Sequence, residues 1–326
     1  MFKVKNAVFS HPLQGDTAEM ISLWQTTFQD SDKFTTLFFS RIYKPENTLV
    51  IKNDGRIVSA LQMIPYKIKT TDGIIPSAYV CGVCTLTSER GKGLMKALML
   101  EAMDNMLQKG YGITTLIPAH PWLFDFYKNL GYIHNINYRL ESYSCEVNPD
   151  MQYKTIKSNI QAVEQSHDYF SDIKIAHFTR KYFTYFNKKQ HERRCAVLHN
   201  DNDINNIISD LINDDGNAWI ALRNDTPVGI AFTCPISEKN VIIKEMLYDS
   251  ILIKEALIHH ILNIYKAKKV IIRIPPQESS TTEMYNISNA HLSVDLNKKI
   301  YPYGLANILD KRITDINGLH MTLMLD

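Results

Sequence analysis

Apolar positions in the N-terminal part of the chain follow first a helical period and then a strand period, with polar turn signals between the segments. Residues 16–42 carry apolar side chains at helical spacing, which predicts two short helices, the first capped by Asp16 together with Glu19. Three apolar runs follow, and Asp-Gly turns join them, which predicts an antiparallel meander. These runs are residues 48–52, 57–69 and 74–86.

A strand and two helices follow the meander. Residues 94–108 predict a helix, with Gly110 just beyond its end. Residues 113–118 predict a short strand that stops at a proline, and residues 121–130 predict a helix that Gly131 closes. This order of elements predicts an α+β fold with a mixed, mostly antiparallel sheet.

The second half of the chain repeats part of this pattern. Residues 218–236 resemble the first hairpin of the meander, and residues 241–275 resemble the strand–helix–strand that ends at Pro118. Two copies of one fold are therefore expected. Between the copies, residues 173–186 and 203–212 predict helices.

This pattern predicts three parts in the chain. Residues 1–145 would form the first copy, residues 146–275 the second, and residues 276–326 a short C-terminal α/β piece. The C-terminal piece is too short to bury a large core by itself.

Composition and charge narrow the class of protein. The chain has 326 residues, 45% of them hydrophobic and 21% charged, which is typical of a folded protein with two or three domains. Its 36 Lys and Arg nearly balance its 34 Asp and Glu, which argues against a nucleic-acid-binding role. The sequence shows neither a membrane-spanning apolar run nor a signal peptide, and its five cysteines are an odd number. We therefore expect a cytoplasmic protein with reduced thiols.

The cysteines also bear on metal binding. Cys81 and Cys84 form a Cys-x-x-Cys motif within an apolar run that reads as a strand. Residues three apart on a regular strand point to opposite faces, so these thiols are not expected to share an ion. No metal is predicted.

The segment most informative about chemistry is Arg90-Gly91-Lys92-Gly93, between a predicted strand and a predicted helix. Glycines allow positive φ and a close approach of an anion, and the first N–H groups of a helix are unpaired. The segment therefore predicts a cradle for phosphate or pyrophosphate. A plain strand-to-helix turn with solvated charges remains the alternative.

Two common phosphate loops do not fit this segment. A P-loop needs Ser or Thr after the lysine, but Gly93 follows Lys92. A dinucleotide fingerprint needs a small residue three positions after Gly93, where Lys96 stands.

The loop resembles the pyrophosphate loop of GNAT N-acetyltransferases, and most closely that of the Eis type (enhanced intracellular survival). The resemblance rests on Gly82-Val83, on Arg90 to Leu94, and on the Phe-Tyr…Gly-Tyr pattern of residues 126–132. It implies two tandem GNAT folds and a sterol-carrier-protein-like C-terminal piece, which residues 301–310 resemble at its opening. It also implies acetyl-CoA as co-substrate.

The resemblance further implies roles for individual residues. Tyr127 would be the general acid, and the C-terminal carboxylate, here that of Asp326, would be the base. Helices near Trp24, Phe28 and Phe38 would line the acceptor site. The residues that would bind acetyl-CoA are Val83, Cys84, Thr85, Arg90, Gly91, Lys92, Gly93 and Leu94.

Each of these roles has a purely structural alternative. Tyr127 and the aromatic residues could belong to the core, and residues 321–325 could form a terminal strand that leaves Asp326 in solvent. The last alternative is preferred, with ordered water as the base.

The predicted function is transfer of an acetyl group from acetyl-CoA to a primary amine by direct attack in a ternary complex. The acceptor would be the amine of a small molecule or of a lysine. Neither nucleic acid nor a membrane is predicted as a partner, and a homo-oligomer is possible. The second copy has Leu247 to Ser250 in place of the loop and is predicted to be structural. A non-catalytic acyl-CoA-binding or interaction protein on the same fold is the rival hypothesis.

Overall fold

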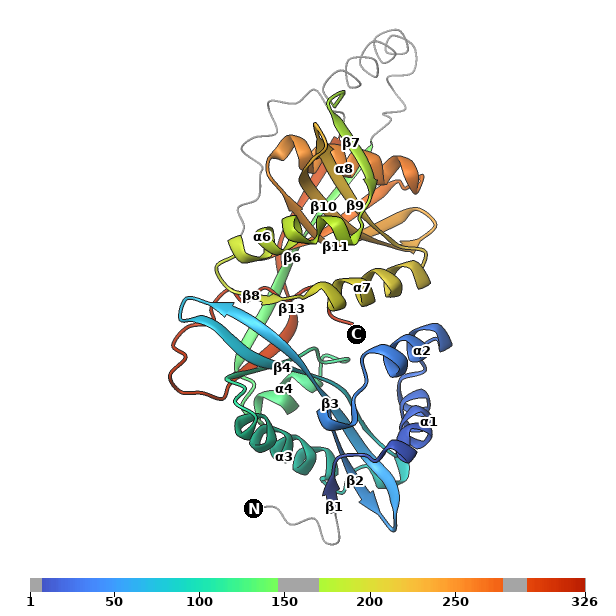
Figure 1. Cartoon of the computed structure of the whole chain (residues 1–326), viewed down its shortest axis with the longest axis vertical. Helices are drawn as coiled ribbons and strands as arrows, with labels where there is room; N and C mark the ends of the chain where they lie inside the picture. The colour runs from blue at the N-terminus through green and yellow to red at the C-terminus, as the bar shows by residue number, and fades with distance from the viewer. Residues whose placement is uncertain (1–7, 146–169, 278–291, 326) are drawn as a thin grey trace. The chain divides into compact units, whose positions relative to one another are not determined.

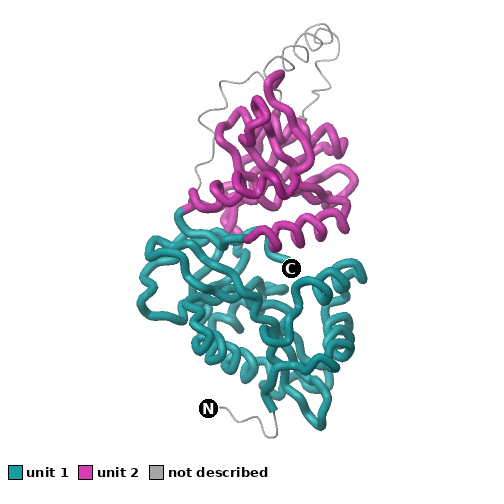
Figure 2. Tube along the Cα trace, viewed as in Figure 1, with its two compact units in different colours: residues 1–136, 194–199, 302–326 teal, residues 137–193, 200–301 magenta. Residues whose placement is uncertain are grey.

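A computed structural model describes residues 8–145, 170–277 and 292–325 (Figure 1). The chain forms two compact units, drawn in different colours in Figure 2. Unit 1 contains residues 1–136, 194–199 and 302–326, and unit 2 contains residues 137–193 and 200–301. This division differs from the three predicted parts, because residues 194–199 and 302–325 pack within unit 1.

Unit 1 combines a mixed sheet with four helices. Its strands lie in the order β1-β2-β3-β4-β5-β13, with β8 beside β3. The helices are α1 (Thr17–Phe28), α2 (Asp32–Arg41), α3 (Leu94–Gln108) and α4 (Leu123–Lys128). The strands are β1 (Val8–Ser10), β2 (Thr48–Asn53), β3 (Arg56–Thr70), β4 (Gly73–Thr85), β5 (Ile113–Leu116) and β8 (Ala196–Leu198), with parts of β6 (His134–Cys145) and β13 (Leu292–Ile308).

The predicted meander is confirmed as β2, β3 and β4, which pair antiparallel. Its turns need glycine, since Gly55 and Gly73 have φ of +80° and +124°. The predicted helix over residues 94–108 is confirmed as α3, and Gly110 follows its end with φ of +79°. The α+β fold class is confirmed in this unit.

The predicted capping box at Asp16 is wrong. A short 3-10 helix over Gln14–Asp16 runs straight into α1, so Asp16 is in the helical region and makes no side-chain cap bond. Its carboxylate instead accepts from the Leu13 N–H and pairs with Lys52 at 2.7 Å. These contacts lower the pKa of Asp16, the hydrogen bond from Lys52 most.

Two groups of helices cover opposite faces of the unit 1 sheet (Figure 1). Leu49 and Ile51 of β2 join the apolar cluster that α3 and α4 form. Val50 lies between them and joins the cluster of α1 on the other face. The strand period of two thus supplies both cores from one strand.

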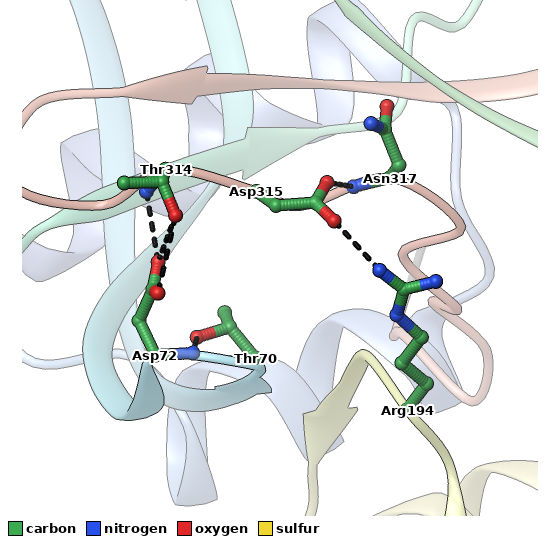
Figure 3. Close-up of polar contacts among 6 residues, drawn as sticks. All are labelled: Thr70, Asp72, Arg194, Thr314, Asp315 and Asn317. Carbon is green, nitrogen blue, oxygen red and sulfur yellow. Dashed lines mark hydrogen bonds and ion pairs between the residues drawn. The ribbon is translucent and has the colours of Figure 1, made fainter.

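The segment after β13 is clamped onto unit 1 by contacts with distant parts of the sequence (Figure 3). The Asp72 carboxylate accepts hydrogen bonds from the N–H (2.8 Å) and the hydroxyl of Thr314. The Arg194 guanidinium pairs with Asp315 at 2.9 Å. Residues 321–325 are all buried. The segment is therefore an integral part of unit 1.

Residues 321–325 form a loop rather than the terminal strand that the sequence allows. Leu323 has φ of +57°, which interrupts an extended backbone. The Nε2–H of His199 donates to the Thr322 carbonyl at 2.9 Å and holds this loop. Asp326 lies outside the described residues.

Unit 2 contains another mixed set of strands and its own helices. Its strands lie in the order β6-β12-β11-β10-β9-β7, and β11 and β12 pair in parallel. The strands are β7 (Ile173–His177), β9 (Asn217–Arg223), β10 (Thr226–Ser237), β11 (Asn240–Tyr248) and β12 (Lys269–Ile274), with parts of β6 and β13. The helices are α6 (Phe183–Glu192), α7 (Asp201–Asn213) and α8 (Ile251–Ile264).

The hairpin and the strand–helix–strand predicted for the second copy are confirmed as β9–β10 and β11–α8–β12. The helix predicted over residues 173–186 is wrong in its first part. Ile173 and Ile175 pack against the unit 2 core from β7, which pairs with β9, and α6 begins only at Phe183. Their spacing of two is the strand period.

No helix within the described ranges is long and apolar enough to cross a membrane.

Candidate active site

The gap between β4 and β5 is the central feature of unit 1. These parallel strands pair only as far as Val80 and Leu116. β4 continues to Thr85 and stays paired with β3 on its other side. Beyond Val80, β4 therefore has an edge on the β5 side that β5 leaves unpaired, where an extended ligand could add its own hydrogen bonds.

A bulge in β4 lies at the start of this unpaired edge. The β3 partners jump from Ala60, opposite Cys84, to Gln62, opposite Cys81. Gly82 lies inside the bulge with φ of +58°. Only glycine takes this backbone conformation without strain.

The bulge overturns the prediction that the thiols of Cys81 and Cys84 lie on opposite faces. Their partners on β3 are two residues apart, so both cysteines share one face. Burial raises the pKa of the Cys84 thiol to about 12, so this thiol stays protonated and unreactive. Among the residues that the structure describes, no group of three or more His, Cys, Asp or Glu is placed to hold a metal ion.

The loop that joins β4 to α3 covers residues 86–93. Gly91 and Gly93 both have φ of +78°, and a Cβ at either position would meet no atom within 4 Å. Backbone conformation, rather than crowding, therefore requires glycine at both positions. The loop stays open above the start of α3.

Both cations of this loop have partners. The Arg90 Nε donates to the Thr85 carbonyl at 3.2 Å, which ties the loop back to the end of β4. The Lys92 ammonium pairs with Glu89 at 3.0 Å. Arg90 therefore orders the loop. Lys92 is exposed and its pair with Glu89 lies at the surface of the loop, so it is weak enough to exchange for a stronger anion.

The start of α3 presents backbone N–H donors to this loop. Gly93 is the N-cap residue and makes no side-chain cap bond, and the first intrahelical bond runs from the Ala97 N–H to the Gly93 carbonyl. The N–H groups before Ala97 point out of the helix, where its dipole is positive. Together with the glycines, they form a geometry suited to an anion.

Tyr127 lies on α4, in the same apolar cluster as Leu94 and, at its edge, Val83. The turn after α4 fixes its backbone, because the N–H groups of Leu130 and Tyr132 donate to the Tyr127 carbonyl. Burial raises the pKa of the Tyr127 hydroxyl to about 12. The phenol is therefore protonated at neutral pH.

An aromatic cluster lies on the other face, on α1 and α2. The Trp24 ring is close to Phe28 (4.9 Å between centroids) and Phe38 (4.6 Å). Phe38 is fully buried and Phe28 is half-buried. Trp24 covers Gly82, so the cluster reaches the bulge of β4.

Unit 2 has a similar gap without the loop. β11 and β12 pair in parallel as far as Ile243 and Ile272, and β11 then continues alone on that side to Tyr248. Only Asp249 and Ser250 separate β11 from α8. This connection lacks the length and the glycines to cradle an anion.

Buried charges lie near the gap in unit 2, and the sequence analysis missed them. The Lys254 ammonium of α8 pairs with Glu141 at 2.6 Å, and both side chains are 3% exposed. The Tyr143 hydroxyl also donates to Glu141 at 2.7 Å. A small pocket beside Lys254 is lined in part by Arg193 and Glu245, which form a second pair.

The structure thus brings most of the predicted site residues of unit 1 to one region. Residues 83–85 and 90–94 lie at the open edge of β4 and at the start of α3. Tyr127 packs from one face and Trp24 from the other. Two residues that contact this region were not predicted. Glu89 pairs with Lys92, and the Ser59 hydroxyl donates to the Cys84 carbonyl at 2.8 Å. No signal in the sequence marks residues that act as partners of site residues.

Comparison with protein families finds one match in this region. Residues 11–134 match the family model described as an acetyltransferase (GNAT) domain. This part of the chain is therefore similar to a GNAT acetyltransferase domain. No curated protein matches the sequence.

Solved structures share the fold over nearly the whole chain. A probable N-acyltransferase of unknown function from Enterococcus faecalis is 14% identical with a TM-score of 0.68, covering 94% of this chain and 73% of that one. Eis1 from Mycobacterium abscessus is 10% identical with a TM-score of 0.63, covering 93% and 74%. Saccharomyces cerevisiae N-myristoyltransferase, solved with bound myristoyl-CoA, is 8% identical with a TM-score of 0.55, covering 94% and 81%. These TM-scores establish a common fold and confirm the predicted fold class.

Proposed function

We propose that this protein is an Eis-type N-acetyltransferase that moves an acetyl group from acetyl-CoA to a primary amine. The observation that carries the proposal is the unpaired edge of β4, which leads into a glycine loop at the start of α3. That arrangement suits a ligand with an anionic end and an extended amide-bearing arm. Tyr127 packs beside it with a protonated hydroxyl.

Acetyl-CoA would bind along β4. Its pyrophosphate would lie against Gly91, Gly93 and the first N–H groups of α3, with the pantetheine amides paired to the backbone of residues 83–85. Lys92 would exchange Glu89 for a phosphate oxygen. Trp24, Phe28 and Phe38 would line the approach of the amine.

The chemical step would be direct attack in a ternary complex. The amine loses a proton to a base and its nitrogen forms a bond to the thioester carbonyl carbon; the carbon–sulfur bond then breaks. Tyr127 gives its proton to the departing thiolate and regains one from the base through solvent. Burial of Tyr127 keeps that proton in place until the thiolate forms.

The proposal also includes the division of the chain into domains. Residues 1–145 would be the catalytic GNAT copy, residues 146–275 a degenerate structural copy, and residues 276–326 a short C-terminal segment. A cytoplasmic location, a possible homo-oligomer and a small-molecule or lysine acceptor belong to the same proposal. One structural neighbour is named an N-acetyltransferase and another an N-myristoyltransferase. The fold alone therefore does not determine the length of the acyl chain.

Release of thiol from acetyl-CoA tests the proposal. The full chain is incubated with acetyl-CoA and a panel containing a polyamine, a small metabolite amine and a lysine peptide. Steady thiol release that depends on an amine is the expected result. Tight acetyl-CoA binding without turnover would favour a non-catalytic acyl-CoA-binding protein, and no binding at all would overturn both.

The base role is assigned to ordered water rather than to Asp326. A chain that stops at Leu325 should then keep kcat within about threefold of the parent. Leu325 is retained because it is buried and its removal would disturb unit 1. A loss above about 100-fold, with acetyl-CoA affinity and melting temperature unchanged, would make Asp326 the base.

A further inference from the structure

The indole of Trp24 is fixed over the bulge of β4. A Cβ built at Gly82 would overlap the six-membered ring of Trp24, so the ring lies directly on the glycine backbone. The Trp24 Nε1–H donates to the Asp30 carboxylate at 2.8 Å. The ring is also packed by Phe28 and Phe38 and is 5% exposed. Its position and orientation are therefore set from several sides.

The order of the ligand along β4 decides which part of it meets Trp24. Under the proposed function, the pyrophosphate lies at residues 90–93, beyond the C-terminal end of β4. The arm then runs back along residues 85 to 83, so the thioester arrives beside Gly82. Just beyond, the pairing of Val80 with Leu116 closes the gap between the strands.

Under the proposed function, the acyl group would lie among groups that the structure holds in place. The paired strands close the far end of the gap, and the cluster that contains Tyr127 covers one face of the sheet. Trp24 covers the other face at Gly82. An acyl chain longer than acetyl would have to displace one of these groups. The Trp24 indole is the one that belongs to a single side chain.

We propose that Trp24 determines the acyl-chain length that this protein accepts, restricting it to acetyl or a chain of similar size. This inference rests on the proposed function, because it uses the placement of acyl-CoA along β4. It assigns Trp24 to the acyl donor, whereas the sequence placed it only in the acceptor site. Truncating the indole should open space beside Gly82 for additional methylene groups.

The test compares acyl-CoA donors of increasing length. The ratio of kcat/KM for hexanoyl-CoA to that for acetyl-CoA is measured with one amine for the parent, Trp24→Ala and Trp24→Leu. We expect the ratio to rise at least about tenfold in Trp24→Ala and less in Trp24→Leu, the size of effect that a few methylene groups cause in an apolar pocket. Affinities of non-hydrolysable thioether analogues of both donors give the same ratio without turnover.

Phe34→Ala is the matched control. It removes an aromatic ring of the same cluster, 6.5 Å from the Trp24 ring, whereas the three atoms nearest to a Cβ built at Gly82 all belong to Trp24. Its ratio should equal that of the parent. If both Trp24→Leu and Trp24→Ala keep the parental ratio, the inference is overturned and the proposed function stands. If the parent already prefers hexanoyl-CoA, the inference is overturned and the donor of the proposed function is a longer acyl-CoA. If the parent binds neither analogue, both fall together.

Discussion

Replacing Tyr127 by phenylalanine is expected to lower kcat by about 10²–10⁴-fold, while the affinity for acetyl-CoA stays within about threefold. The ring of Tyr127 packs in the core of α3 and α4, and phenylalanine preserves that packing. Only the hydroxyl is lost, and its proton is needed in the transition state, when negative charge collects on sulfur. Steady-state thiol release and calorimetry measure the two quantities separately.

The pH profile supplies a second readout for Tyr127. Its pKa is raised to about 12 by burial, so the acid stays protonated throughout the neutral and mildly alkaline range. The kcat of the parent should therefore not fall between about pH 8 and 10, where an ordinary tyrosine begins to lose its proton. A fall in this range would mean that another group limits the reaction.

Tyr132→Phe is the matched control for Tyr127→Phe. Tyr132 is fully buried in the same cluster, and its hydroxyl bonds to that of Thr114 at 3.1 Å. This variant should lose some stability, about 1 kcal/mol for one hydrogen bond, but keep kcat within a few-fold. If Tyr127→Phe behaves like Tyr132→Phe, its hydroxyl is structural and the proton comes from water.

Much of the fold could be predicted because its signals are local. The Asp-Gly turns specify the hairpins of β2, β3 and β4, since their backbone requires positive φ. The limits of α3 follow from Gly93 on one side and Gly110 on the other. The pattern of the second half was recognisable because β9, β10 and β11 repeat the order of turns and apolar runs found in the meander.

The errors share a different origin, because they depend on contacts between distant residues or on irregular backbone. The faces of Cys81 and Cys84 depend on a bulge that becomes visible only in the register with β3. Asp16 has Lys52 as a partner, which draws its carboxylate away from the helix end. β7 is a strand because β9 offers it a free edge. None of these partners can be identified from the local sequence.

The buried pair of Lys254 and Glu141 shows the same limit in unit 2. In the sequence, Lys254 is one charge in an apolar helix, and Glu141 lies more than a hundred residues away. Burial of either charge alone would be costly, so each needs the other, and the Tyr143 hydroxyl is a further partner of Glu141. The pair and the two-residue connection between β11 and α8 support a structural role for unit 2 in the proposed function.

Replacing Gly93 by aspartate should abolish acetyl-CoA binding at the single site expected in the chain. Gly93 has φ of +78° at the start of α3, where the pyrophosphate is proposed to lie. A carboxylate there would compete for the helix N–H groups and repel the phosphates. At about 4 Å, that repulsion is on the order of 1 to 4 kcal/mol, depending on solvent exposure. We expect the dissociation constant from calorimetry to rise at least about 100-fold.

Two variants separate charge from backbone strain and unit 1 from unit 2. Gly93→Ala meets no neighbouring atom within 4 Å, so it adds only the cost of positive φ, about 1–2 kcal/mol, and should weaken binding far less than aspartate does. Asp249→Asn changes the corresponding connection in unit 2 and should leave acetyl-CoA affinity unaltered. Equal losses for Gly93→Ala and Gly93→Asp would show that loop conformation, not charge, governs the site. Two acetyl-CoA molecules per chain would contradict the structural role of unit 2.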